Sequence, residues 1–123
     1  SYAWDTTIAF LQKVNSDYGS SSEEGNYNNT TFSYIDITGA SKTKEKNSNV
    51  LVPTGQTTPV CNIYDMGGNV WEWTTERCSL TDGPYALRGG TCYNNFTSHP
   101  AGFRFSYSAV ADALFGFRLT LFM

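Results

Sequence analysis

The C-terminal part of the sequence lacks five residue types that are present elsewhere in the chain. Residues 91–115, TCYNNFTSHPAGFRFSYSAVADALF, contain no Trp, Met, Lys, Glu or Gln. Residues 1–76 contain 15 residues of these types, close to their usual abundance in proteins. The same C-terminal segment nevertheless keeps six aromatic residues, which are Tyr93, Phe96, Phe103, Phe105, Tyr107 and Phe115. It therefore excludes particular residue types while it retains large rings.

Other absences exclude whole classes of function. The chain has 8 basic and 11 acidic residues and a net charge of −3, so it lacks the basic character of proteins that bind nucleic acid. No apolar run reaches the roughly 18 residues that cross a bilayer, which predicts no membrane insertion. Cys61, Cys78 and Cys92 form neither an even set nor a Cys-x-x-Cys pair. We expect three free thiols, with a single disulfide as the alternative.

The length of 123 residues suits one domain. An amphipathic helix is predicted over residues 2–15, with Ser1 as a candidate N-cap, because apolar residues recur at helical spacing. These residues are Trp4, Ile8, Leu11 and Val14. Residues 15–58 are rich in Ser, Asn, Gly, Thr and charge, which predicts a polar surface insertion. Alternation and β-propensity predict short strands at 32–37, 49–53, 69–76 and 117–122, and TDGP at 81–84 predicts a turn.

The segment DMGGNVWEW combines a turn with a strand. Gly67 and Gly68 permit a tight turn with positive φ, and Trp71 and Trp73 are expected on one face of the strand, with Glu72 on the other. We interpret these residues as turn and core. Three arginines, Arg88, Arg104 and Arg118, are predicted to be structural donors to carboxylates such as Asp65 or Glu72.

Three separated motifs carry a family resemblance. CNIYDMGGNVWEWTTE, ALRGGT and GFRLTLF occur in that order, and together they resemble the C-terminal half of the formylglycine-generating-enzyme-like family over about residues 60–122. YAWDTTIAF is similar to the second helix of that family. The resemblance implies one α+β domain over residues 1–123 with a C-type-lectin-like fold, of the formylglycine-generating-enzyme-like subclass. The family's first strand and first helix would precede Ser1, so we expect the chain to be part of a longer protein; the alternative is that the fold is completed in some other way.

The resemblance also provides a test for catalysis. Catalytic members oxidise a substrate cysteine with two cysteines placed four and nine residues after the second glycine of the Arg-Gly-Gly motif. Those positions are Asn94 and His99 here, and Cys92 has no cysteine partner within the segment. Without two thiolates there is no copper site and no pair of sulfur nucleophiles. We therefore expect no catalytic residue, and His99 is predicted to be a solvated loop residue.

No cofactor is expected. The alternative is calcium held by the carbonyl groups of Gly68 and Val70 and the carboxylate of Glu72, as some family members imply. One carboxylate makes a weak calcium site, so the sequence predicts no metal.

The missing residue types match the chemistry of one branch of the family. In the variable proteins of diversity-generating retroelements, a reverse transcriptase randomises template adenines in the last segment. Asparagine codons of the AAC or AAT type become NNC or NNT codons, which never encode Trp, Met, Lys, Glu or Gln. Asn94 and Asn95 fit unmutated template positions. A fixed frame would comprise Pro100, Ala101, Arg104, Gly116, Phe117 and Arg118.

The sequence thus predicts a non-catalytic ligand-binding or receptor-binding module with a variable region at residues 91–115. Its partner would be a protein or glycan on a target cell surface, and its location a phage tail or a bacterial surface. The candidate contact residues are Cys92, Tyr93, Asn94, Phe96, His99, Phe103, Phe105, Tyr107, Asp112, Leu114 and Phe115. The alternatives are a structural or carbohydrate-binding domain of the same family and, third, a divergent formylglycine-generating oxidase.

Overall fold

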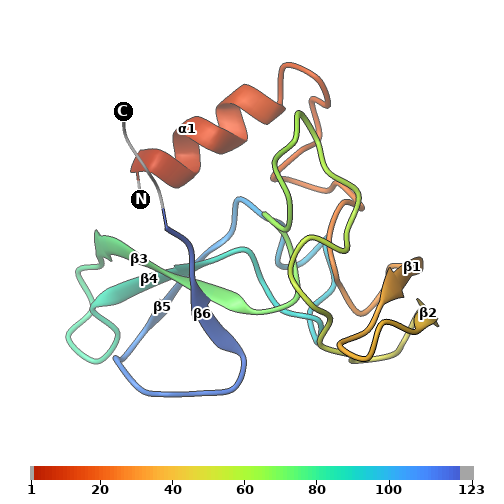
Figure 1. Ribbon diagram of the computed structural model, residues 1–123. Coiled ribbons are helices and arrows are strands. Elements are labelled where there is room, and N and C mark those ends of the chain that lie inside the picture. Colours follow the sequence, from red (N-terminus) through yellow and green to blue (C-terminus); the bar gives the residue numbers. More distant parts are fainter. Residues whose placement is uncertain (1, 120–123) are drawn as a thin grey trace.

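The described part of the chain combines one helix with two small sheets, of which one is antiparallel and has two strands and the other is mixed and has four (Figure 1). The computed structural model describes residues 2–119. Its elements are α1 (Tyr2–Leu11), β1 (Phe32–Ile35), β2 (Ser41–Lys44), β3 (Trp71–Arg77), β4 (Tyr85–Arg88), β5 (Arg104–Tyr107) and β6 (Phe115–Phe117). The helix and strand content confirms the predicted α+β class.

The larger sheet has the strand order β5-β4-β3-β6. Strand β4 pairs antiparallel with both β3 and β5, whereas β6 pairs parallel with β3. Strands β1 and β2 form a separate antiparallel hairpin, which lies on the opposite side of the molecule from the β3–β4 connection (Figure 1). Helix α1 lies along one side of the larger sheet (Figure 1).

The predicted helix is confirmed but is shorter than expected. It ends at Leu11, and the next turn tightens, with the Val14 amide donating to the Leu11 carbonyl at 3.0 Å. Trp4, Ile8 and Leu11 are buried, whereas Val14 is 67% exposed. Val14 was therefore wrongly assigned to the apolar stripe, because the helix ends before the stripe reaches it. The predicted N-cap, Ser1, lies outside the described residues.

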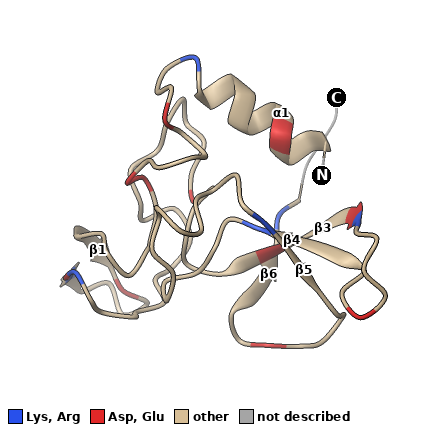
Figure 2. Cartoon of the chain, turned by 180° about the vertical axis from the view of Figure 1, so that it is seen from behind, with Lys and Arg blue, Asp and Glu red and all other residues tan. Residues whose placement is uncertain are grey.

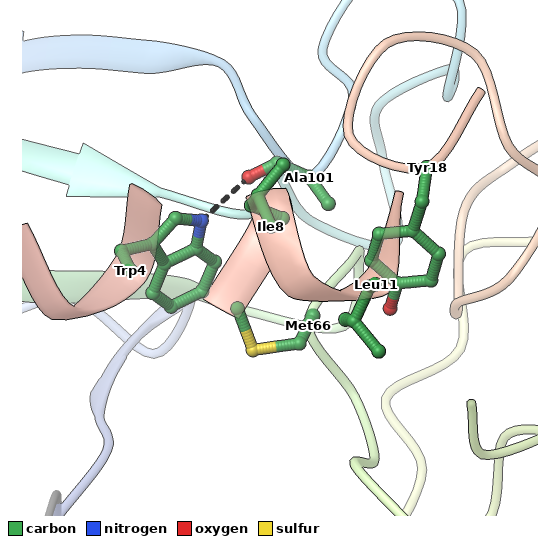
Figure 3. Close-up of a cluster of buried hydrophobic side chains, with 6 residues drawn as sticks. All are labelled: Trp4, Ile8, Leu11, Tyr18, Met66 and Ala101. Atoms are coloured by element: carbon green, nitrogen blue, oxygen red, sulfur yellow. Dashed lines mark hydrogen bonds between the residues drawn. The ribbon is translucent and has the colours of Figure 1, made fainter. Parts of the chain in front are cut away.

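The helix packs into a small core (Figure 3). The indole Nε1 of Trp4 donates to the carbonyl oxygen of Ala101 at 2.8 Å, which ties the first turn to a segment 97 residues away. Ile8 and Leu11 pack beside Met66, the residue that precedes Gly67 and Gly68 in the sequence. The core therefore joins α1 to the double-glycine turn and to the chain before β5.

The polar segment 15–58 is more than a surface insertion. It contributes buried side chains to the interior, and these are Tyr18, Ser22, Asn26, Tyr27, Thr30, Lys44, Val52 and Thr57. The expectation that the segment lies on the surface is wrong at these positions, because several of its polar groups find partners inside the molecule. The Thr30 hydroxyl, for example, donates to the Gly25 carbonyl, and the Thr57 hydroxyl donates to the Asp65 carboxylate. Strand β1 confirms the prediction at 32–37, β2 was not predicted, and residues 49–53 form no strand.

The C-terminal strand begins earlier than predicted. Strand β6 covers Phe115–Phe117, the next two residues leave the sheet, and 120–122 lie outside the described residues. The TDGP segment, predicted as a turn, bends at residues 81 and 82 and lies between β3 and β4. Within the part of the chain that the structure describes, no helix has the length and apolar character needed to span a membrane.

Candidate binding surface

The two faces of the larger sheet carry different chemistry. The pairing of Trp73 with Leu87, and of Leu87 with Phe105, places these side chains on one face. The pairing of Glu72 with Arg88, and of Arg88 with Arg104, places charges on the other face. Charged groups of that second face contact α1, because the Arg88 guanidinium binds Asp5. The apolar face therefore points away from the helix.

Aromatic rings form a continuous row across the face that points away from α1. The rings of Trp71 and Phe105 stack at 5.4 Å between centroids and 23° between planes. Phe105 contacts Tyr107 at 5.5 Å, and Tyr107 contacts Phe115 at 5.2 Å. Phe115 in turn meets Trp73 edge-on at 5.4 Å. The placement of Trp71 and Trp73 on one face confirms the sequence prediction.

His99 and Phe103 extend this row at the end that contains Trp71. The His99 ring lies 5.9 Å from Trp71 and 4.7 Å from Phe103. His99 lies in a loop, as predicted, but it is half-buried rather than fully solvated. Its ring lies beside the Trp71 indole, which also contacts Phe103 at 6.1 Å. At the other end, Tyr85 meets Trp73 at 6.1 Å. We call this set the ring surface, and it comprises Trp71, Trp73, Tyr85, His99, Phe103, Phe105, Tyr107 and Phe115.

The ring surface combines residues from two parts of the chain. Trp71, Trp73 and Tyr85 come from β3 and β4, outside the candidate variable segment, while the other members come from residues 91–115. Trp71 is 7% exposed and Phe105 is 37% exposed. The indole of Trp71 thus forms a buried floor under rings that reach solvent, an arrangement that lets outer side chains change while the support stays.

The remaining predicted contact residues separate into exposed and buried groups. Tyr93 is 56% exposed, which suits a contact residue, but Cys92 is fully buried. Cys92 is therefore wrongly assigned to the contact surface; its side chain points into the protein, and burial raises the pKa of its thiol. All three cysteines are unpaired. Asn94 has a local structural role, because its side-chain oxygen accepts from the Thr91 amide at 2.8 Å and the Thr91 hydroxyl at 3.0 Å.

The loop between β5 and β6 ends in a turn that the predicted residues hold together. The exposed carboxylate of Asp112 accepts from the Leu114 amide at 2.8 Å. The Leu114 carbonyl accepts from the Trp71 amide at 2.8 Å, so the end of this loop is fixed to β3. Asp112 and Leu114 therefore position Phe115 on the ring surface, and only Asp112 of the two is exposed.

Phe96 lies apart from the ring surface. Its ring meets the buried ring of Tyr27 at 6.2 Å, and its amide donates to the side chain of Asn29 at 3.2 Å. Asn29 belongs to the segment predicted to be a surface insertion. The sequence carries no signal for its contact with the C-terminal segment, because the two residues lie more than sixty positions apart.

Arg118 lies on the side of the sheet that faces α1, where its guanidinium is 5.8 Å from the centre of the Trp4 ring. The Arg118 guanidinium forms two hydrogen bonds to the Glu72 carboxylate, at 2.9 and 2.8 Å, and it also donates to the carbonyl groups of Tyr64 and Asp65. This confirms the prediction that Arg118 is a structural donor to Glu72. Burial raises the pKa of Glu72, and the contact with Arg118 acts in the opposite direction.

The other two arginines bind carboxylates that the sequence did not indicate. Arg88 donates to Asp5 at 2.6 Å, Arg104 also binds Asp5, and Arg104 donates to Glu76 at 3.0 Å. In Figure 2 several blue basic segments of the sheet lie near its centre, and another lies beside a red segment at the end of β3. Asp5 therefore links the helix to two neighbouring strands, which confirms a structural role for Arg88 and Arg104 with different partners.

The carboxylate suggested as a calcium ligand is bound to an arginine. Both carboxylate oxygens of Glu72 accept hydrogen bonds from Arg118, so a calcium ion there would have to displace a guanidinium cation. No group of three or more His, Cys, Asp or Glu side chains with metal-site geometry occurs among residues 2–119.

Comparison with known proteins gives one match. A family model described as the sulfatase-modifying factor enzyme 1-like domain matches residues 1–121. No curated protein and no solved structure matches the chain.

Proposed function

This chain belongs to the sulfatase-modifying factor enzyme 1-like family, and within that family we propose that it is a non-catalytic module that binds a ligand or receptor through a diversified C-terminal segment. The observation that carries the proposal is the ring surface, on which side chains of residues 91–115 surround the fixed ring of Trp71. Aromatic side chains that reach solvent in a contiguous group are typical of interaction sites.

The composition of residues 91–115 supports diversification by a retroelement. The five residue types absent from the segment are those that NNC and NNT codons do not encode, and the segment keeps Tyr, Phe, Ser and Asn. Tyr and Phe supply large contact area at a low cost in side-chain entropy, and Ser and Asn supply adaptable hydrogen bonds, as in antibody binding sites. We propose a C-type-lectin-like fold as the scaffold.

Catalysis of the formylglycine-generating type is disfavoured by the residues at the expected cysteine positions. Asn94 is held in a local turn by Thr91, and His99 packs against Trp71. The remaining nearby thiol, Cys92, is fully buried and its pKa is raised by burial, so the thiolate needed as a nucleophile or copper ligand is disfavoured. We therefore propose that the module has no cofactor.

The proposed partner is a protein or glycan on a target cell surface, and the proposed location is a phage tail or a bacterial surface. Exposed Tyr93 and partly exposed Phe105 supply the anchors for such contacts. Aromatic residues in the centre of an interface contribute much of its binding energy. Glu72, Arg88 and Arg104 lie on the other face of the sheet. The ring surface is therefore mostly apolar, with the Arg77 guanidinium over the Tyr85 ring at one end.

The proposal is tested by sequencing independent copies of the gene together with the flanking DNA. We expect differences to concentrate between codons 91 and 115, and we expect a near-copy of this segment, rich in asparagine codons, beside a reverse-transcriptase gene. Codons for Trp71 and Trp73 should stay constant, because these rings are the floor of the surface. Differences scattered evenly along the gene would contradict the proposal.

A biochemical test separates the binding module from the oxidase. The purified protein, incubated with copper and a sulfatase-type cysteine peptide, is expected to give no aldehyde product above a blank without protein. If the parent forms product and Cys92→Ser does not, the chain is an oxidase and the binding-module proposal is wrong. Arrays of glycans and of cell-surface proteins, probed with the parent and with Tyr93→Ala, would identify the class of partner.

A further inference from the structure

Lys44, at the end of β2, is buried in a way that sets it apart from the other lysines. It is 1% exposed, whereas Lys13, Lys42 and Lys46 are exposed. The salt bridges found among residues 2–119 do not include Lys44. A buried ammonium group needs compensation for the loss of water, and here that compensation comes from the backbone.

Backbone carbonyl oxygens surround the ammonium group. The Nζ atom donates to the carbonyl oxygens of Tyr27 at 2.6 Å and Thr30 at 2.9 Å. Longer contacts reach the carbonyl oxygens of Asn28 at 3.3 Å and Glu45 at 3.4 Å. Three of these four oxygens belong to one short loop, residues 27–30, which has no helix or strand of its own. Carbonyl groups that converge in this way repel one another unless a cation lies between them.

The same loop supports the C-terminal segment. The Asn28 amide donates to the Asn94 carbonyl at 2.8 Å, and the Asn29 side chain donates to the Asn95 side chain at 3.0 Å. The Phe96 amide donates to Asn29 at 3.2 Å. Residues 94–96 thus form three hydrogen bonds with the loop, and these connect residues 66 or 67 positions apart in the sequence.

We propose that the Lys44 ammonium acts as a built-in cation that fills a cage of backbone carbonyl groups and thereby positions residues 91–99 through the 27–30 loop. Lys44 is a positioning residue in this arrangement, since it lies beneath the loop rather than on the surface. Burial lowers the pKa of Lys44, as is expected of an ammonium that has exchanged water for a small number of carbonyl groups.

Chemical rescue tests whether the cage binds a cation. Lys44→Ala removes Cγ, Cδ, Cε and Nζ, which are the atoms that n-propylammonium would supply. The matched control is Lys42→Ala, two residues away on the same strand, where the lysine is exposed and pairs with Asp36 at 2.7 Å. We expect n-propylammonium to raise the melting temperature of Lys44→Ala in a concentration-dependent manner. Sodium chloride at the same ionic strength and neutral 1-propanol should not do so, and Lys42→Ala should respond to none of them.

The proposal is wrong if n-propylammonium raises the melting temperatures of both variants equally, or if 1-propanol raises that of Lys44→Ala as much as n-propylammonium does. If Lys44→Ala does not fold, the unaltered protein gives a direct readout. Nuclear magnetic resonance of the lysine side chains should then detect one ammonium group whose protons exchange slowly with water, and its signal should be absent in Lys44→Met. No such protected ammonium at neutral pH would refute the proposal.

The link to the C-terminal segment is read by hydrogen exchange, without any ligand. In Lys44→Met, the amides of Asn28, Asn94 and Phe96 should exchange at least about tenfold faster, the effect expected from the loss of one charged hydrogen bond. Amides of β3 and β4 should change less, and Lys42→Met should match the parent. If the exchange rates of all amides increase equally, Lys44 contributes only to the overall stability of the fold and the proposed positioning role is wrong. This inference concerns the order of residues 91–99, so it can hold even if the proposed binding function fails.

Discussion

Replacing Phe105 by Ala should lower the free energy of unfolding by about 2–3 kcal/mol, although Phe105 belongs to the candidate variable segment. Its side chain is 37% exposed, so nearly two thirds of it is covered. Complete burial of such a side chain contributes about 1.5–3 kcal/mol, and the covered part therefore roughly 1–2 kcal/mol. The stacked contact with Trp71 at 5.4 Å adds about 0.5–1.5 kcal/mol.

Tyr93→Ala is the matched control within the same segment. Tyr93 is 56% exposed, and none of the ring contacts found among the described residues includes it. Its replacement should change stability by no more than about 0.5 kcal/mol. For a domain of this size, a loss of 2–3 kcal/mol corresponds to a decrease in melting temperature of roughly 10 °C, so the two variants are easily distinguished.

The measurement is thermal and urea unfolding of the parent, Phe105→Ala and Tyr93→Ala under the same conditions. If Phe105→Ala melts together with the parent, the packing of Phe105 on Trp71 is wrong and the ring surface has no buried floor. If Tyr93→Ala melts as early as Phe105→Ala, Tyr93 is part of the core. Once a partner is known, both variants should lose roughly 1–3 kcal/mol of binding free energy.

Three further predictions concern single features of the fold. Burial raises the pKa of Tyr18 from 10.0 to about 12, so stability should fall as the pH rises from 10 toward 12, and Tyr18→Phe should make this fall smaller in urea titrations at each pH. Gly68→Ala should lower the free energy of unfolding by more than about 3 kcal/mol. The φ angle of Gly68 is +71°, and the new Cβ would lie 2.2 Å from a backbone carbonyl oxygen. Gly55→Ala is the control: its φ is +83° but nothing lies within 4 Å of the new Cβ, so it should cost about 1–2 kcal/mol in thermal unfolding. Arg118→Met should lower the free energy of unfolding by about 2–4 kcal/mol, because it leaves the Glu72 carboxylate without its guanidinium partner. Adding Glu72→Gln should recover part of that stability. If the double variant is no more stable than Arg118→Met, the role of the ion pair is contradicted.

Several elements were predictable because their signals are local. The helix follows from the spacing of Trp4, Ile8 and Leu11, and β3 follows from the alternation around Trp71 and Trp73. Hydrophobic periodicity reports how neighbouring residues share a face, and that relationship is set by backbone geometry alone. The absence of five residue types from residues 91–115 is likewise a property of the sequence and needs no fold to be read.

The strands β2, β4 and β5 were not predicted, and their lengths explain this. Each has four residues, too few for alternation to stand out from chance. Their pairing depends on partners elsewhere in the chain, as when Tyr85 pairs with Tyr107, 22 positions later in the sequence. Tertiary context decides such short strands.

The sequence by itself determined the helix, the central strand, the family motifs and the unusual composition of the C-terminal segment. Only the tertiary structure decided that Cys92 is buried, that His99 packs on Trp71, and that Lys44 lies inside a cage of carbonyl groups. The physical reason is that the burial of a polar or reactive side chain depends on which distant backbone groups converge around it. Asp5 shows the same principle, since it binds Arg88 and Arg104, which are 83 and 99 residues away. The sequence around Asp5 does not indicate which distant side chains it will contact in the folded protein.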